Sequence, residues 1–210
     1  MTDSSTGPHL ALFDYGAGNL HSLQKGLEAG GARVTVTQDW NEALARDGLV
    51  LPGVGSFGAA VRAMAGWEER VRKALADGLP GLGICLGMQL LFPESEEGAG
   101  TGIGLIPGRV LRFEGGAVPR IPQMGWNDVE PLGGSDPVVG PATGFSAYYA
   151  NSYICRPDDS SCLVAQTTYG HGTFPAAVRT ARTWGVQFHP EKSSAAGVEL
   201  LGRFVQEVAR

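Results

Sequence analysis

The sequence contains little cysteine and little lysine, and it lacks long apolar runs. Three cysteines in a chain of 210 residues are too few, and odd in number, for a disulfide framework. Only three of the basic residues are lysines, no basic run is present, and the net charge is −5. We therefore expect no nucleic-acid partner. No apolar stretch approaches the length of a membrane span, so we expect no membrane partner either.

Residues 1–8 lack the basic and apolar regions of a signal peptide, and we expect them to be disordered. The chain is 43% hydrophobic and shows neither a linker nor an internal repeat. Residues 1–210 are therefore expected to form one cytoplasmic domain with its own core. Cys155 and Cys162 flank a turn-like segment. They are either partners across a hairpin or, as we prefer, two reduced strand residues.

Strand-like and helical segments alternate through the first half of the chain. Short apolar or β-branched runs predict strands at 9–13, 33–37, 48–51 and 79–84. Helical spacing of apolar residues, and the lengths of the intervening segments, predict helices at about 20–29, 41–46, 56–76 and 86–92. Asn19 is expected to cap the first of these helices. The alternation predicts an α/β fold with a mostly parallel central sheet and helices on both faces.

The second half of the chain is punctuated more often by glycine and proline. Its short segments predict strands at 104–106, 109–113, 127–130, 147–155, 162–167 and 176–179, followed by a strand at 184–188 and a closing helix at 195–209. This pattern is typical of an antiparallel extension of the sheet. Ligands of parallel α/β sheets bind beyond the carboxyl ends of the strands, so catalytic or binding residues are expected there.

Cys85 stands between a predicted strand and a predicted helix, at the centre of Gly83-Ile-Cys-Leu-Gly87. This is a Gly-x-nucleophile-x-Gly elbow with cysteine as the nucleophile. The flanking glycines have no Cβ to clash as the backbone bends. The N-terminal N–H groups of the following helix would favour a thiolate. The alternative is a buried cysteine that serves only the core.

His189 and Glu191 follow the predicted strand 184–188, two residues apart. On a continuing extended segment both side chains would share one face. A carboxylate that orients an imidazole beside a cysteine is the arrangement of a catalytic triad. The alternatives are a solvated strand end or a metal site, and the sequence offers no second His or Cys nearby for a metal. We therefore expect no metal and no cofactor.

The turn Pro52-Gly-Val-Gly55 follows the third predicted strand. Acyl transfer needs backbone N–H donors that face the developing oxyanion, each contributing about 3–4 kcal/mol. We predict that the N–H groups of Val54 and Leu86 fill this role. The overlapping stretch 53–58 also matches Gly-x-Gly-x-x-Gly, so a dinucleotide site is an alternative. It follows the third strand rather than the first and lacks a well-placed acidic residue.

These motifs together resemble the class I glutamine amidotransferases. The matching stretches are 14–20, 52–57, 83–92, 122–127, 148–153 and 186–193, which occur in the family's order along nearly the whole chain. The cysteine elbow and His-Pro-Glu specify only the class. Met-Gly-Trp-Asn at 124–127 and the Lys-Ser after His-Pro-Glu resemble the glutaminase subunits of imidazole glycerol phosphate synthase, from histidine biosynthesis.

The resemblance implies a reaction and a set of binding residues. Cys85 would attack the side-chain amide of L-glutamine, His189 would pass a proton to departing ammonia, and Glu191 would orient His189. A thioester forms, and water then releases glutamate. The oxyanion and substrate residues implied by the family are Gly53, Val54, Gly55, Leu86, Gln89, Ser152 and Tyr153. Without the resemblance, Gln89 would read as a surface residue one helical turn after Cys85.

The resemblance also implies a partner, a cyclase subunit of the (β/α)8-barrel type that receives ammonia through a channel in a heterodimer. Asn19, Tyr148 and Lys192 match the family's interface positions, although Lys192 alone could be a solvated lysine at a strand end. The chain departs from the family at Asn151, where His is usual and where Asn cannot carry charge near neutral pH. Two other hypotheses remain open: a glutaminase subunit of a pyridoxal phosphate or anthranilate synthase, and a non-enzymatic thiol sensor.

Overall fold

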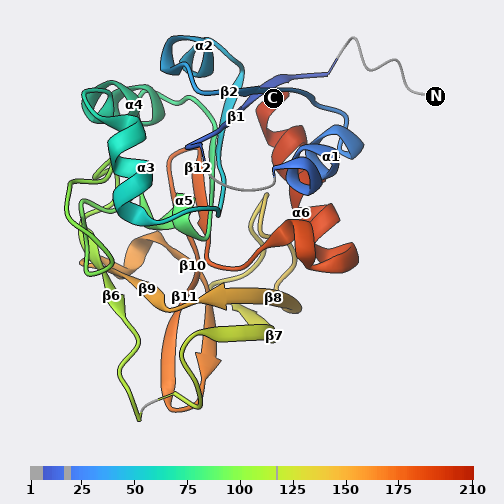
Figure 1. Cartoon of the computed structure of the whole chain (residues 1–210). Coiled ribbons are helices and arrows are strands. Elements are labelled where there is room, and N and C mark those ends of the chain that lie inside the picture. The colour runs from blue at the N-terminus through green and yellow to red at the C-terminus, as the bar shows by residue number, and fades with distance from the viewer. Residues whose placement is uncertain (1–6, 17–19, 117) are drawn as a thin grey trace.

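A computed structural model of the chain describes residues 7–16, 20–116 and 118–210. Its centre is a nine-stranded sheet with the order β2-β1-β3-β4-β12-β11-β10-β7-β8 (Figure 1). The strands are β1 His9–Phe13, β2 Arg33–Thr37, β3 Gly48–Leu51, β4 Gly81–Ile84, β7 Gln123–Pro131, β8 Phe145–Asn151, β10 Leu163–Tyr169, β11 Gly172–Thr180 and β12 Thr183–Val186. The run from β2 to β12 is parallel, and the pairs from β12 to β8 are antiparallel. The predicted parallel sheet with an antiparallel extension is confirmed.

Helices cover both faces of the parallel part of the sheet. They are α1 His21–Ala29, α2 Trp40–Leu44, α3 Phe57–Met64, α4 Glu68–Ala76, α5 Leu86–Gln89 and α6 Ser194–Val208. Successive residues of β1 show the two faces: Leu10 and Leu12 pack in one core with α1 and α6, whereas Ala11 and Phe13 pack in the other with α2, α3 and α4. The alternation follows from the two-residue period of a strand. Figure 1 shows the two helix layers on either side of the strands.

A second, three-stranded sheet has the order β5-β6-β9. It consists of β5 Glu94–Ser95, β6 Gly108–Arg112 and β9 Tyr153–Pro157. The single strand predicted at 147–155 is therefore wrong. Strand β8 ends at Asn151, and the chain enters the second sheet as β9 at Tyr153. Two 3₁₀ turns, η1 Ser160–Cys162 and η2 Pro190–Lys192, complete the elements.

Other sequence predictions need correction. The helix predicted at 56–76 is divided into α3 and α4, because Gly66 adopts a φ of 82° that a helix cannot contain. Residues 104–106 form no strand, and the chain bends at 105–107. The helix predicted at about 86–92 is shorter, since α5 ends at Gln89. Asn19, which we expected to cap α1, and residues 1–6 lie outside the described residues.

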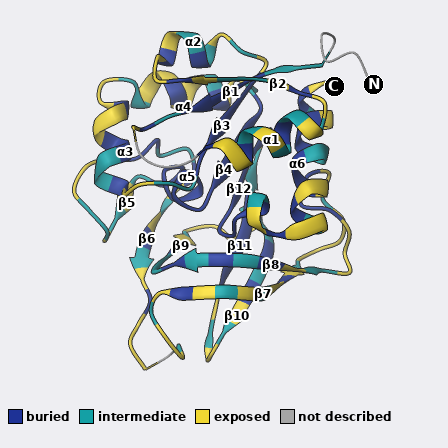
Figure 2. Ribbon diagram, turned by 45° about the vertical axis from the view of Figure 1, so that its right-hand side comes forward, coloured by how far each residue is buried: buried dark blue, intermediate teal, exposed yellow. Residues whose placement is uncertain are grey.

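Burial is concentrated in the sheet and on the helix faces turned toward it (Figure 2). Strands β3, β4 and β12 are buried along their whole length, whereas buried and exposed residues alternate along β7. All three cysteines are free. Cys155 lies on β9 as a strand residue, but the strand expected at Cys162 is wrong, because this residue ends the 3₁₀ turn η1. None of the described helices is both long and apolar enough to span a membrane.

Candidate active site

The backbone turns sharply at Cys85, between β4 and α5. Cys85 adopts φ 47° and ψ −101°, which is rare for a residue that carries a side chain. The flanking glycines make the turn sterically possible: a Cβ on Gly87 would lie 2.0 Å from the carbonyl oxygen of Leu51, and one on Gly83 would lie 2.5 Å from that of Gly87. The Cys85 N–H donates to the Val186 carbonyl at 2.7 Å, which fixes the elbow against β12.

The imidazole of His189 is held by a carboxylate. Nδ1 of His189 lies 2.8 Å from Oε1 of Glu191. The extended geometry that we expected for this pair is wrong, because residues 190–192 form the 3₁₀ turn η2, with Pro190 at its first position. The turn folds Glu191 back onto the ring. The backbone N–H of His189 donates to the Tyr148 carbonyl at 2.8 Å, so the main chain at His189 is anchored to β8.

His189 faces both the carboxylate and the sulfur. Burial alone would lower the pKa of His189, but hydrogen bonds with Cys85 and Glu191 outweigh it and raise the pKa to about 9. Because Nδ1 is committed to Glu191, the other ring nitrogen, Nε2, is left for Cys85. His189 therefore carries a positive charge at neutral pH and faces the sulfur as a proton donor.

The glycine turn after β3 packs directly on these two side chains. A Cβ on Gly53 would lie 2.9 Å from both Cys85 Cβ and His189 Cε1, so only glycine fits between them. The turn also contains Gly55, with a φ of 96°. Val54 packs its side chain against a hydrophobic core cluster, and it is not among the residues that line the cavity beside Cys85.

That cavity has a volume of about 180 Å³. It is lined by Gly53, Gly55, Cys85, Leu86, Gln89, Glu97, Ala150, Asn151, Ser152 and Tyr153. Six of the seven residues that we expected at the oxyanion and substrate site are in this set, with Val54 the exception. The volume is below that of drug-sized sites and suits a ligand the size of an amino acid.

One wall of the cavity comes from the break between β8 and β9. The amide Nε2 of Gln89 donates to the Tyr153 carbonyl at 3.4 Å, and Nδ2 of Asn151 donates to the same carbonyl at 3.1 Å. Oδ1 of Asn151 is buried and has no hydrogen-bond partner among the described residues. Asn151 thus contributes an uncharged, buried amide to this wall.

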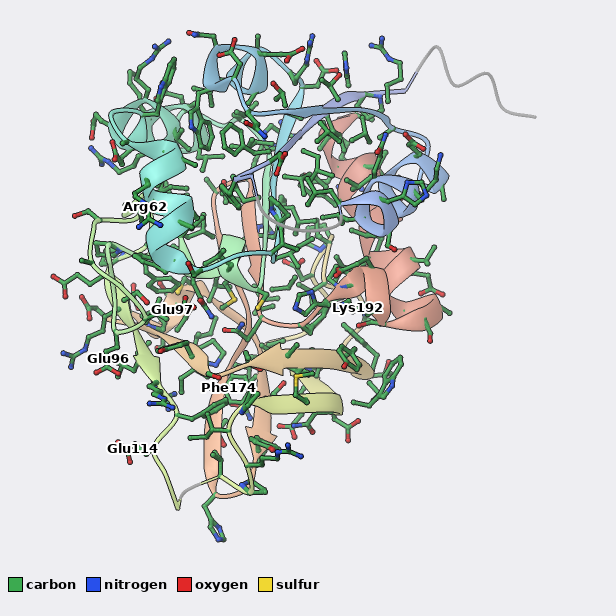
Figure 3. The ribbon with its side chains drawn as sticks, viewed as in Figure 1. Arg62, Glu96, Glu97, Glu114, Phe174 and Lys192 are labelled. Atoms are coloured by element: carbon green, nitrogen blue, oxygen red, sulfur yellow. The ribbon has the colours of Figure 1, made fainter. Side chains whose placement is uncertain are left out.

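Two residues of the site were missed by the sequence reasoning. Glu97 lines the cavity, and its Oε2 accepts the Phe57 N–H at 3.1 Å near the start of α3 (Figure 3). It belongs to an acidic segment that carries no catalytic signal in the sequence. Gln187 is fully buried, and its Nε2 lies 3.5 Å from Cys85 Sγ. Its position between the apolar residues Val186 and Phe188 was the signal in the sequence that could have indicated a buried polar role.

An exposed aromatic face lies on β7 and β8, next to the site. Trp126 and Met124 are 54% and 60% exposed, which is unusual for large apolar side chains. Trp126 packs edge-on against Tyr148, with ring centroids 6.3 Å apart. Nζ of Lys192 lies 5.8 Å from the Tyr148 ring, and Figure 3 shows Lys192 between α6 and β8. Two of the three expected interface residues thus meet here, and Asn19 lies outside the described residues.

Known proteins resemble this chain along nearly its whole length. Residues 11–208 match the family model for glutamine amidotransferase class-I. The chain is 44% identical to the imidazole glycerol phosphate synthase subunit HisH of Synechococcus elongatus, over 96% of this chain and 94% of that protein. It is 43% identical to the HisH subunit of Natronomonas pharaonis, over 98% of this chain and 97% of that one.

Solved structures share the fold. A crystal structure of a glutamine amidotransferase matches with a TM-score of 0.74 at 20% identity, over 97% of this chain and 100% of that one. The structure of PurLQS from Thermotoga maritima matches with a TM-score of 0.72 at 19% identity, over 97% of this chain and 98% of that one. At these identities the likeness concerns the fold alone.

Proposed function

Because the chain belongs to the class I glutamine amidotransferase family, we propose that it hydrolyses L-glutamine as the glutaminase subunit of imidazole glycerol phosphate synthase. It delivers the ammonia to a cyclase subunit that makes imidazole glycerol phosphate and AICAR in histidine biosynthesis. The observation that carries the proposal is the 44% identity to a HisH subunit over 96% of the chain. The whole chain, 1–210, acts as one domain in this proposal.

Cys85, His189 and Glu191 are the catalytic residues. The thiolate of Cys85 attacks the side-chain carbonyl carbon of glutamine, and a C–S bond forms as the carbonyl oxygen becomes an oxyanion. The His189 imidazolium, with its pKa raised to about 9, gives its proton to the amide nitrogen, and the C–N bond breaks to release ammonia. Glu191 holds the ring through its 2.8 Å contact with Nδ1.

The thioester is then hydrolysed at the same site. The neutral imidazole of His189 takes a proton from water, the hydroxide attacks the thioester carbon, and the C–S bond breaks. Glutamate leaves, and the thiolate and imidazolium are restored. The backbone N–H groups of Leu86 and Val54 stabilise the oxyanion in both steps. Leu86 and Gly53 already line the cavity, and Val54 follows Gly53 directly.

The rest of the cavity binds the amino-acid part of the substrate. Glu97 brings the one carboxylate among the residues that line the cavity, and it suits the ammonium group of glutamine. Gln89, Ser152, Tyr153 and Gly55 supply the remaining polar contacts. Because a free reduced cysteine is needed for the chemistry, we place the enzyme in the cytoplasm, where thiols stay reduced.

The partner is a cyclase subunit of the (β/α)8-barrel type. Ammonia released into water would be protonated and lose its nucleophilicity, so it must pass directly to the partner. The exposed Trp126 and Met124, beside Tyr148 and Lys192, give the aromatic and cationic composition of a protein interface next to the site. Asn19 belongs to this interface in the proposal.

A Cys85→Ala variant tests the proposal in the reconstituted complex. We expect glutamine-dependent cyclisation to fall at least about a thousandfold, whereas cyclisation with added ammonium salt persists. Cys162→Ala, which changes a thiol outside the cavity, is the matched control and should keep both reactions. Glutamine hydrolysis retained by Cys85→Ala would contradict the catalytic assignment. Co-purification of a pyridoxal phosphate or anthranilate synthase in place of the cyclase would overturn the subunit assignment.

A further inference from the structure

A line of buried amide side chains lies behind the nucleophile. Gln187 is fully buried and Gln89 is 4% exposed. Strands β4 and β12 are parallel, with Ile84 opposite Val186, so the next residues along the two strands, Cys85 and Gln187, lie side by side. Nε2 of Gln187 lies 3.5 Å from Sγ of Cys85. This contact is separate from those that His189 makes.

The direction of the Gln187 amide is fixed by its neighbours. The Tyr153 carbonyl can only accept a hydrogen bond, so Gln89 must turn its NH2 group toward it, at 3.4 Å. The same NH2 group donates to Oε1 of Gln187 at 3.5 Å. If the Gln187 amide were flipped, its NH2 group would face that of Gln89, donor against donor. Gln187 therefore presents a donor, not an acceptor, to the sulfur.

We infer that Gln187 is a further catalytic residue of the proposed glutaminase, whose side-chain N–H donates a hydrogen bond to the Cys85 thiolate. The donor stabilises the thiolate before the attack and again when sulfur leaves the thioester carbon. Gln89 and the Tyr153 carbonyl act as positioning groups, because they hold the amide in the donating orientation. The inference rests on the proposed function only in taking Cys85 as the nucleophile.

A neutral amide suits this position. It neither gains nor loses a proton over the range in which the enzyme works, so it remains a donor at every stage. His189 must give up its proton during the reaction. Once it has done so, Gln187 still donates a hydrogen bond to the sulfur of Cys85. A second cation in a fully buried position would have to be desolvated, whereas an amide is satisfied by Gln89 and the sulfur.

The test is the rate at which iodoacetamide alkylates Cys85 in the full-length chain, followed by peptide mass spectrometry across a range of pH. Gln187→Met keeps the length of the side chain and removes the donor. We expect alkylation of this variant to be about tenfold slower near neutral pH, with the difference closing at high pH, where the thiol ionises without help. Gln187→Glu should be slower still, because it places a negative charge beside the sulfur.

The matched control is Gln166→Met, which makes the same change on β10, where Gln166 contacts Glu130 at 3.1 Å. It should alkylate as the unchanged chain does. Equal rates for Gln187→Met and the unchanged chain at every pH would overturn the inference, while a Cys85→Ala variant without glutaminase activity would still uphold the proposed function.

If Gln187→Met does not fold, NMR of the unchanged chain decides. The side-chain amide resonance of Gln187 should move with pH as Cys85 ionises, and this movement should be absent in Cys85→Ala. A resonance that behaves alike in both proteins would contradict a hydrogen bond to the sulfur.

Discussion

The parallel and antiparallel parts of the central sheet meet at the candidate active site, and they contribute to it differently. Parallel strands β4 and β12 are buried along their whole length; β4 leads directly into Cys85, and β12 ends at Val186, shortly before His189. Antiparallel strand β8 supplies part of the cavity wall, and its neighbour β7 carries the exposed Trp126. Figure 2 shows exposed residues along β7. In the proposed mechanism the first part holds the reacting groups, whereas the second part faces the cavity and the surface.

The two parts also differ in how much change they tolerate. Around Cys85 the backbone is so closely packed that a Cβ on Gly53 or Gly87 would overlap its neighbours. In the β8–β9 wall, by contrast, buried Oδ1 of Asn151 has no hydrogen-bond partner among the described residues, and the strand pairing of β7 with β8 is unbroken all the same. We therefore expect changes in the parallel part to stop turnover without weakening the partner complex, and changes in the exposed antiparallel face to do the reverse.

Gly53→Ala should have the largest effect. The new Cβ would lie 2.9 Å from both Cys85 Cβ and His189 Cε1, so the nucleophile and the base must move apart. Since misplacement by about 1 Å can cost a hundredfold, and both groups are displaced, we expect glutaminase kcat/KM to fall by about a thousandfold. Steady-state kinetics of the complex measure this.

Gly202→Ala on α6, where a Cβ would meet nothing within 4 Å, is the control and should keep full activity. Should Gly53→Ala retain more than about a tenth of the activity, the close packing at the triad would not be needed for catalysis.

Glu191→Gln is expected to lower kcat by about a hundredfold. It removes the charge that helps to raise the pKa of His189 while keeping the side-chain length. Partner affinity should stay the same, which separates this effect from those on the antiparallel face. Glu199→Gln, the same change in an ion pair on α6, is the control and should leave kcat intact. An unchanged kcat in Glu191→Gln would remove Glu191 from the triad.

Trp126→Ala should weaken cyclase binding by about thirtyfold and leave the fold intact, because exposed aromatic residues at interfaces commonly carry about 2 kcal/mol. Calorimetric titration of the cyclase measures it. Val36→Ala, on β2 at the opposite edge of the sheet, removes a side chain that is 41% exposed and should not affect binding. Equal affinities for the two variants would place the docking face elsewhere.

The pH dependence should be the mildest effect. Since the pKa of His189 is raised from 6.5 to about 9, glutaminase activity should fall about tenfold per pH unit above about pH 9, as the imidazolium is lost. The raised pKa also contributes to stability: the contribution, roughly 3 kcal/mol, is complete below about pH 6.5 and is lost as the pH rises through about 9. Urea unfolding at several pH values measures the second effect. Stability that rises over this range would contradict a charged His189.

The parallel half of the fold could be predicted closely, because its signals are local. The β-branched run at 33–37 and the apolar run at 48–51 became β2 and β3 with the predicted bounds. The antiparallel half was harder to predict, because the limits of its strands depend on the strands with which they pair. The run 147–155 is continuously strand-like in sequence, and only pairing with β7 on one side and β6 on the other divides it at Ser152.

The residues of the candidate site likewise divide into those with a local signal in the sequence and those without one. The elbow of Cys85 and the His-Pro-Glu motif are contiguous patterns, so both were visible in the sequence. Glu191 faces His189 as expected, but the expected reason was wrong, since a 3₁₀ turn and not an extended segment brings the two side chains together. Glu97 and Gln187 could not be assigned from the sequence, because each is placed by a contact with a residue distant in sequence, Phe57 and Cys85 respectively.

The most direct test of the triad is covalent labelling by a diazo-ketone analogue of L-glutamine, in the presence of the cyclase. The reagent needs both a thiolate nucleophile and a proton donor beside it. The account predicts a single adduct, on Cys85, that is absent in Cys85→Ala and strongly slowed in a His189→Ala variant. Labelling on another residue, or labelling of Cys85 at the same rate without His189, would contradict the account.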